Sequence, residues 1–422
     1  MKNWNRMLGF GLSAALLLGA LAGCTPSGNN QPTGTPSPTV STDAGTIPLV
    51  ATEDSVQKVV GIPGDTVMFT VNGEDITAAE LYYWIAASVE RVGYYSFGSA
   101  SAIDWTATQD EQTIAEFILE DAKQTATFYR LIKIEATKAG ITLSDEDKAD
   151  LQDQIRQYID QMGEDGYANR LQQICLSDEE FRNILEIGYL YSSVQNHLYG
   201  DKGQTPPTSE GLIAMAEEQG LMLAKHILIK TVSVGSDGTN TPLSDEEQAA
   251  AKTKAEGILA QLKAVEGDAQ QALFDQLMEE NSEDGRNADG TLSSPDGYLF
   301  GTGEMVQEFE DATAALEYNQ ISDLVKTDYG YHIILRLPPD NADMRDRWLN
   351  AKMEETTDGW LAAAQVEDGT EMAKIDVKAF YDALTAYRDS LNPVEETPTP
   401  SQTPTPSETP VPSETPSASA KG

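Results

Sequence analysis

The sequence predicts an α+β protein in which one mixed segment, residues 221–337, is flanked by helical stretches. Three observations support this. Apolar residues three and four apart run through most of residues 77–198 and return after residue 340. Residues 221–337 instead alternate short apolar runs typical of strands with helical patterns. Both ends of the chain are rich in Thr, Pro and Ser, a composition typical of disorder.

The first helical stretch opens with a short strand over Val67–Val71, followed by the turn pair Asn72-Gly73. Thr77 and Glu80 have the spacing of a capping box, which predicts a helix from there to about Val92. Further helices are expected over residues 112–139, 144–162, 177–198 and 344–365. Cys175 is interpreted as a small buried apolar residue, and His197 as a surface residue at a helix end.

The mixed segment is predicted to run β-α-α-β-α-β-β, with strands over residues 221–230, 298–300, 321–325 and 330–337. Its first two helices are expected over residues 244–265 and 273–281. Because side chains alternate along a strand, His226 shares a face with Ala224 and Leu228, and His332 shares a face with Ile334. If the first and last strands pair at the sheet centre, the two imidazoles meet on one face.

Composition excludes several classes of function. The chain has 28 basic and 68 acidic residues, a formal net charge of −40, which opposes binding to nucleic acid or to an anionic lipid surface. Two cysteines cannot build a disulfide framework, and three histidines form no HExxH or Cys/His zinc pattern. Residues 285–290 resemble part of a calcium loop, but Gly285 and Asp296 occupy its first and twelfth positions. No metal and no cofactor is therefore expected.

The N-terminus has the pattern of an export signal. Lys2 and Arg6 precede an apolar run from Leu8 to Leu21 that is too short for a comfortable membrane span. The run ends in Leu21-Ala22-Gly23-Cys24, which looks like the lipobox of bacterial lipoproteins. The resemblance implies a signal peptide over residues 1–23, acylation of Cys24 (with palmitate among the acyl groups), and anchoring at the extracytoplasmic face of the cell membrane. A plain secretory or anchor segment with a chance cysteine is the alternative.

Two low-complexity segments flank the folded part. Residues 24–62 are predicted to be a disordered stalk. Residues 393–422 carry three similar hexads, TPTPSQ, TPTPSE and TPVPSE, whose X-Pro steps exclude helix and sheet. This tail is interpreted as a spacer or wall-spanning segment, with a partner-binding motif as the alternative.

Three motifs in the mixed segment carry a resemblance to a known family. Ala224-Lys225-His226-Ile227-Leu228 is similar to the SHILV strand that opens parvulin domains. Residues 300–312, FGTGEMVQEFEDA, are similar to the parvulin pattern F-x-x-G-x-M-x-x-x-F-E-x-A, and residues 321–334, ISDLVKTDYGYHII, resemble its ending. The match covers about 115 residues in the right order. The segment is therefore identified as a parvulin-type (PpiC-like) peptidyl-prolyl isomerase domain.

The resemblance implies a four-stranded antiparallel sheet with helices, and a site for isomerising X-Pro bonds. The side chains that it implies for catalysis are His226, Asp284, Thr327 and His332. Those that it implies for binding the proline ring are Phe300, Met305 and Phe309. A structural role of the two histidines within the sheet, and of Asp284 in a solvated loop, are the alternatives.

The chain departs from the parvulin pattern just before Phe300. The family usually has GGDLG-x-F, whereas residues 294–300 here are SPDGYLF. The leucine that normally lines the pocket is therefore missing, or replaced by Tyr298 or Leu299. The loop over residues 231–243 contains no Lys or Arg, although phosphate-directed parvulins place basic residues there, so phosphopeptide specificity is not expected.

The flanking helices resemble the chaperone domain of SurA/PrsA-type foldases, which begins with a motif like Val71-Asn72-Gly73. This resemblance implies one all-α chaperone-like domain over residues 63–217 and 341–392, with the parvulin domain, residues 218–340, inserted in it. The implied partners are unfolded or partly folded secreted proteins that contain X-Pro bonds. The expected function is peptidyl-prolyl isomerisation and chaperoning of exported proteins outside the cytoplasmic membrane. The alternative is a non-catalytic holdase with a vestigial parvulin domain.

Overall fold

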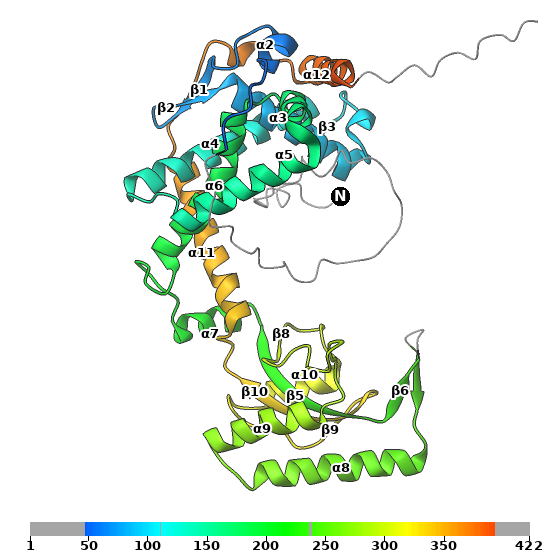
Figure 1. Cartoon of the computed structure of the whole chain (residues 1–422). Coiled ribbons are helices and arrows are strands. Elements are labelled where there is room, and N and C mark those ends of the chain that lie inside the picture. Colours follow the sequence, from blue (N-terminus) through cyan, green and yellow to red (C-terminus); the bar gives the residue numbers. More distant parts are fainter. Residues whose placement is uncertain (1–46, 110, 236–238, 393–422) are drawn as a thin grey trace, which may run out of the picture.

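The computed structural model describes residues 47–109, 111–235 and 239–392. It has two parts: a sheet body over residues 221–337, and a helical body over the described residues before and after it. They are joined where α7 (Ser209–Glu218) packs against α11 (Ala342–Ala363) (Figure 1). Its helices and antiparallel sheets confirm the predicted α+β class. The predicted signal peptide, Cys24 and the tail over residues 393–422 lie outside the described residues. Within the described ranges, no helix is both long and apolar enough to cross a bilayer.

The helical body is assembled from segments on both sides of the sheet body in the sequence. Its longer helices are α3 (Ala78–Val92), α4 (Ile114–Lys138), α5 (Asp145–Gln173), α6 (Asp178–Tyr199) and α12 (Val377–Leu391). Its shorter elements are α2 (Ser55–Val60), η2 (Gly93–Phe97), η3 (Ala100–Ala102), β3 (Thr108–Gln109), β4 (Gln112–Thr113) and η4 (Met372–Lys374). One core cluster joins Phe69, Ile85, Ile132, Phe181 and Leu384. Residues from before and after the sheet body therefore share one core.

The helical body also contains a sheet, so the prediction of an all-α domain was wrong in this respect. The strands β1 (Val67–Val71), β2 (Glu74–Thr77) and β11 (Val366–Asp368) pair in the order β11-β1-β2. Asn72 and Gly73 form the hairpin turn with φ of 51° and 86°, conformations that Asn and Gly tolerate best. Short edge strands of two to four residues carry too little pattern to be predicted from sequence.

Two helices, α3 and α5, differ in detail from the prediction. The Thr77 hydroxyl accepts a hydrogen bond from Glu80 N at 3.3 Å, but the Glu80 carboxylate pairs with Arg130 at 2.8 Å instead of closing a capping box. Within α5 the helix breaks at Gly163, with a non-helical φ of 74°, directly after the expected end at Met162, and a further helical stretch to Gln173 follows that was not predicted. Glycine adopts this angle without steric cost, so the chain bends and resumes its helix.

The boundary of the predicted stalk at residue 62 was wrong. Residues 47–62 are described, and within them Ser55–Val60 forms α2, whose Val56 is buried in the core. Val50 N donates to the buried Asp178 carboxylate at 2.8 Å, and Arg182 donates to the carbonyl of Ile47 at 3.1 Å. The apolar residues of this segment follow directly on a Thr/Pro/Ser-rich stretch, so the whole range was assigned to the stalk from its average composition.

The sheet body is built on a four-stranded antiparallel sheet with the order β8-β5-β10-β9. Its strands are β5 (Met222–Lys230), β8 (Tyr298–Phe300), β9 (Val325–Lys326) and β10 (Gly330–Leu337), with a separate hairpin of β6 (Val232–Val234) and β7 (Asn240–Pro242). β5 and β10 pair along their whole length, from Leu223↔Leu337 to Lys230↔Gly330. The strand predicted over 321–325 is shorter, because Ile321 makes only an isolated bridge to Leu335.

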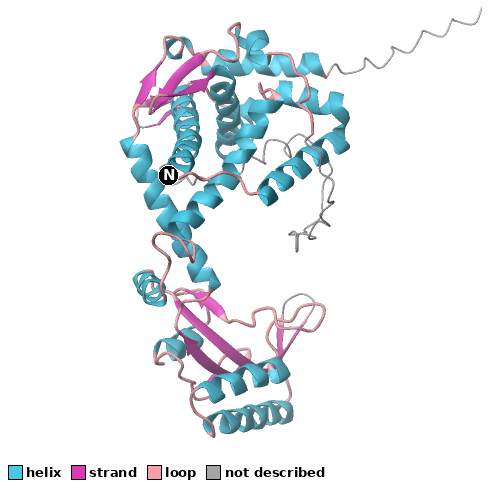
Figure 2. Ribbon diagram, turned by 60° about the vertical axis from the view of Figure 1, so that its left-hand side comes forward, coloured by secondary structure: helices cyan, strands magenta, loops and turns pink. Residues whose placement is uncertain are grey.

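The two faces of this sheet are covered differently. The helices α8 (Asp245–Lys263) and α9 (Asp268–Asn281) cover one face, where Ile227, Ile229, Ile333 and Leu335 form an apolar core with them (Figure 2). The helix α10 (Gln307–Ala314) lies on the other face, which carries His226 and His332. One face therefore holds the body together, and the opposite face presents the polar residues.

A smaller apolar cluster joins the two bodies. It consists of Leu212 and Ala216 from α7 with Met344 and Trp348 from α11, and Leu221 and Leu299 of the sheet body pack against it. The insertion of residues 218–340 stays a prediction, and this cluster lies at both of its boundaries.

Candidate functional site

The site is centred on two histidines from the central strand pair. His226 lies opposite Ile334 and His332 lies opposite Leu228, so the two imidazoles are diagonal neighbours on one face. Their Nδ1 atoms lie 3.1 Å apart, and their ring centroids 5.1 Å apart. The sequence-based expectation that the two rings meet on one face is confirmed.

Asp284 lies at the outer end of the pair. One of its oxygens, Oδ2, is 2.9 Å from His226 Nε2 and 2.6 Å from the Tyr298 hydroxyl. The hydrogen bond from His226 holds the pKa of Asp284 well below its usual range, burial opposes this, and the Tyr298 hydroxyl adds to the lowering. Asp284 is therefore ionised near neutral pH and accepts both hydrogen bonds.

Thr327 lies at the inner end of the pair, where its hydroxyl is 2.9 Å from His332 Nε2. The same oxygen accepts a hydrogen bond from Tyr329 N at 3.2 Å. Burial is the main cause that lowers the pKa of His332 to about 3, and repulsion from the charge of His226 adds to it. The ring is therefore neutral near pH 7.

These contacts fix the direction of the hydrogen bonds when both rings are neutral. His226 donates Nε2–H to Asp284, which leaves its Nδ1 as an acceptor. His332 must then donate Nδ1–H to His226, which leaves its own Nε2 to accept from Thr327. The result is a continuous chain of hydrogen bonds with no nucleophile activated at either end.

An apolar layer lies against the two imidazoles. The Phe309 ring makes edge contacts with both, at 5.1 Å from His226 and 5.6 Å from His332, and lies 5.7 Å from Phe300. Phe300 and Phe309 are only 1% and 3% exposed, whereas Met305 is partly buried at the edge of the same cluster. Phe300 therefore packs against Phe309 inside the cluster, and Met305 is the more accessible of the three.

The turn that carries Met305 is held by a buried carboxylate that the sequence reasoning missed. Glu310 is 4% exposed, and its Oε1 accepts from Gly303 N at 2.8 Å and from Met305 N at 2.9 Å. Two backbone donors thus bind one carboxylate oxygen, which fixes the turn over α10. The signal was a glutamate directly after Phe309 on a short helix, where it faces inward.

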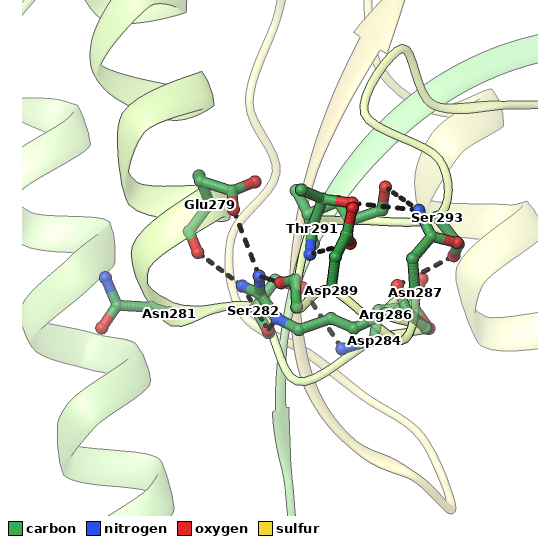
Figure 3. A network of polar contacts seen from close by, with 12 residues as sticks. Glu279, Asn281, Ser282, Asp284, Arg286, Asn287, Asp289, Thr291 and Ser293 are labelled. Carbon is green, nitrogen blue, oxygen red and sulfur yellow. Dashed lines mark hydrogen bonds and ion pairs between the residues drawn. The ribbon is translucent and has the colours of Figure 1, made fainter.

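The loop that carries Asp284 is held by an arginine. Arg286 extends back to the end of α9 (Figure 3), where it donates to the Glu279 carbonyl and to the Glu279 carboxylate at 3.2 Å. It also donates to the carbonyl of Gly290 at 2.6 Å. Its guanidinium thus holds carbonyl oxygens of the loop that resembled a calcium site. Across the described residues, no three His, Cys, Asp or Glu side chains are grouped to hold a metal ion.

The structure shows where Tyr298 and Leu299, the two candidates to replace the missing leucine, lie relative to the site. Leu299 points away from the site and packs near Trp348, so it does not replace the missing leucine. Tyr298 faces the site, with its ring centroid 5.7 Å from that of His226. Its hydroxyl enters the hydrogen-bond chain, which the sequence did not predict. The signal was its position opposite Ala224, two residues before His226 on the neighbouring strand.

Comparisons with known proteins agree with this geometry. Residues 226–337 match the family model described as Rotamase, PPIC-type PPIASE domain. Peptidyl-prolyl cis-trans isomerase Pin1 of Malus domestica is 36% identical over 115 residues, which are 27% of this chain and 90% of that protein. Foldase protein PrsA of Staphylococcus epidermidis is 34% identical over 199 residues, which are 47% of this chain and 52% of the relative.

The likeness is not spread evenly over the chain. The chain spans about half the length, or less, of the PrsA proteins that it matches. The crystal structure of PrsA from Bacillus subtilis shares 18% identity, over 67% of this chain and 91% of that one, with a TM-score of 0.23, too low to support an argument about the fold. The near-complete match to a Pin1 isomerase at 36% identity and the family model carry the assignment. This chain belongs to the parvulin-type, PPIC-type peptidyl-prolyl isomerase family, and over part of its length it is similar to proteins named PrsA.

Proposed function

We propose that this chain is a peptidyl-prolyl cis-trans isomerase and chaperone that assists the folding of exported proteins outside the cytoplasmic membrane. The observation that carries the proposal is the hydrogen-bond chain from Asp284 through His226 and His332 to Thr327, lying against Phe309. We assign catalysis to these four polar residues, and binding of the proline ring to Met305 and Phe309, with Phe300 as their support.

The arrangement suits a reaction in which no bond is made or broken. Amide resonance opposes rotation of an X-Pro bond with a barrier of about 18–20 kcal/mol. In the twisted amide that resonance is lost, and the carbonyl becomes less polar. A site that grips the proline ring and excludes water therefore favours the twisted amide over the planar one. Each ~1.4 kcal/mol of such preference gives a tenfold rate increase, so a preorganised site without a nucleophile is sufficient.

The chaperone part of the proposal rests on the helical body and on the likeness to proteins named PrsA foldases. The partners would be unfolded or partly folded secreted chains with X-Pro bonds. Because loop residues 231–243 carry no Lys or Arg, we propose unphosphorylated substrates.

For localisation, the proposal rests on the sequence alone. The apolar run and Leu21-Ala22-Gly23-Cys24 support lipidation at Cys24 and anchoring at the extracytoplasmic face of the cell membrane. Cys24→Ala should release the protein from the membrane or leave it as unprocessed precursor. Metabolic acyl labelling that is unchanged in Cys24→Ala would refute the anchor.

Two activities measured on the same full-length preparation test the function. In a protease-coupled assay, the chain should accelerate cis-trans exchange of a short unphosphorylated proline peptide. In a separate assay it should suppress aggregation of a refolding protein. Suppression of aggregation without any acceleration over the uncatalysed rate would leave the holdase alternative and refute the isomerase.

A further inference from the structure

Tyr298 has no role in the family pattern quoted above, yet its hydroxyl is the closest polar contact of Asp284. We propose that Tyr298 is a positioning residue of this site: its hydroxyl holds the Asp284 carboxylate where that carboxylate receives His226 Nε2–H, and so sets the tautomers of both histidines. The proposal deepens the proposed function and rests on it for its kinetic consequences only.

The backbone places Tyr298 rigidly beside the histidine. Tyr298 pairs with Ala224 across β8 and β5, and Ala224 lies on the same strand face as His226. Gly297, directly before it, has φ of 91°, and a Cβ there would lie 2.6 Å from the Ala224 carbonyl oxygen. Only glycine permits this close approach of the two strands. The Tyr298 ring then packs edge-on against His226, with an interplanar angle of 79°.

The carboxylate depends on this hydroxyl because few other groups hold it. Among side chains of the described residues, only His226 and Tyr298 donate to Asp284, and both use the oxygen Oδ2. The backbone N–H of Gly285 also donates to this carboxylate, but it lies on the same loop and does not tie it to the sheet. The nearest arginine in sequence, Arg286, is directed to Glu279 and Gly290 instead. Without the phenol, the carboxylate can rotate about its last side-chain bond, and Oδ2 is no longer fixed in front of His226 Nε2.

Loss of that acceptor propagates along the chain of hydrogen bonds. If His226 carries its proton on Nδ1 instead of Nε2, it faces the Nδ1–H of His332, and the two donors repel each other. His332 must then move its proton to Nε2, towards Thr327. Tyr298 thus acts on His332 through two intermediate residues without touching it.

The test uses the three histidines of the chain, His197, His226 and His332, as the only imidazole signals in a histidine-labelled sample. With ¹⁵N-histidine in the full-length protein, the nitrogen shifts report which ring nitrogen carries the proton. We expect Nε2–H for His226 and Nδ1–H for His332 in the wild type. In Tyr298→Phe, which keeps the ring, both should shift towards the opposite tautomers, and His197 should stay unchanged.

The kinetic arm compares Tyr298→Phe with Tyr318→Phe as a matched control. Tyr318 also donates to a carboxylate, that of Glu217 at 3.1 Å, but lies outside the site. Tyr298→Phe should lower kcat/KM about five- to tenfold, mostly through kcat, because it removes one hydrogen bond to a charged group. In an Asp284→Asn background the same change should have almost no further effect, and Tyr318→Phe should be silent in both.

The outcomes separate this inference from the proposed function. Wild-type nitrogen shifts and wild-type kcat/KM in a folded Tyr298→Phe chain overturn the role of Tyr298. Equal, additive losses in the wild-type and Asp284→Asn backgrounds overturn its action through Asp284. A wild-type chain without isomerase activity overturns the proposed function instead, and the nitrogen shifts still decide whether Tyr298 sets the tautomers.

Discussion

The Nδ1 atoms of His226 and His332 lie 3.1 Å apart, a separation that one hydrogen between two neutral rings satisfies. Protonation of His226 at Nδ1 would place two N–H groups against each other unless the chain of hydrogen bonds reverses. In the reversed chain, His332 would donate to Thr327, whose hydroxyl could then donate elsewhere. The pair therefore couples the protonation state of the site to the orientation of the Thr327 hydroxyl.

The first prediction concerns pH and stability. Burial lowers the pKa of His332 to about 3, whereas an unfolded histidine titrates near 6.5. Between these values the unfolded chain binds a proton that the folded chain does not. The stability contributed by neutral His332 is thus fully present above about pH 6.5 and is lost as the pH falls towards 3.

Wild type should accordingly lose ~2 kcal/mol more than His332→Asn in the free energy of unfolding between pH 7.5 and pH 5. Urea unfolding at the two pH values measures this difference. His197→Asn, at an exposed position at the end of α6, is the control and should follow the wild type. Parallel pH courses of wild type and His332→Asn would contradict a neutral buried ring.

The second prediction concerns the proline pocket. Met305→Ala and Phe309→Ala should each lower kcat/KM, Met305→Ala by about tenfold. Phe309 is 3% exposed and touches both imidazoles, so its loss should also destabilise the sheet body by ~3–5 kcal/mol. Suppression of aggregation should hardly change in Met305→Ala. Loss of both isomerase activity and suppression of aggregation in Met305→Ala would contradict the assignment of isomerisation to the sheet body and chaperoning to the helical body.

The third prediction concerns the buried carboxylate of Glu310. Glu310→Ala removes the buried acceptor for Gly303 N and Met305 N, at a cost of ~1.5–3 kcal/mol for hydrogen bonds to a charged group. The turn should loosen, so that KM rises several-fold while the chain stays folded. Glu308→Ala, on the exposed side of the same helix, should leave both KM and the melting temperature unchanged. Identical behaviour of the two variants would show that Glu310 does not hold the turn.

The fourth prediction concerns the insertion. Residues 218–340 should fold alone, because β5 and β10 pair from end to end and bring both boundaries together at Leu223↔Leu337. Joining residue 217 to residue 341 by a short linker should leave a helical protein. Leu221 and Leu299 pack against the cluster that contains Trp348, so removal of the sheet body should expose Trp348 to water. The fluorescence of Trp348 should therefore shift to longer wavelength in the joined protein. A fragment without cooperative thermal unfolding would place the boundaries elsewhere.

Sequence reasoning predicted the parts of this fold whose signal is local. The alternation around His226 and His332 was enough to put both rings on one face, because β5 and β10 are long and their register follows from their apolar sides. It failed for β11, three exposed residues that pair with a strand almost 300 positions away. Such a pairing depends on how α11 delivers the chain to β1, which no local pattern encodes.

The site shows the same limit. Asp284 and Thr327 were located by motif, and the structure brings both to the histidines, although their roles in catalysis stay a prediction. Tyr298 was missed because its contact with Asp284 depends on which strands are neighbours in the sheet. Glu310 was missed because its carboxylate binds backbone N–H groups of the preceding turn, and its residue type does not show this. Phe300 is 1% exposed and lies against Phe309, and its part in binding the proline ring stays a prediction.

The central claim is that this site accelerates rotation about X-Pro bonds, and exchange spectroscopy on a proline peptide tests it most directly. An unphosphorylated peptide with one Leu-Pro bond interconverts over tens to hundreds of seconds when alone. With a small molar fraction of the full-length wild type, exchange between its cis and trans signals should become fast enough to give cross-peaks within about a second, and Met305→Ala should slow it about tenfold. Exchange that is as slow with the wild-type chain as with the peptide alone would contradict the account.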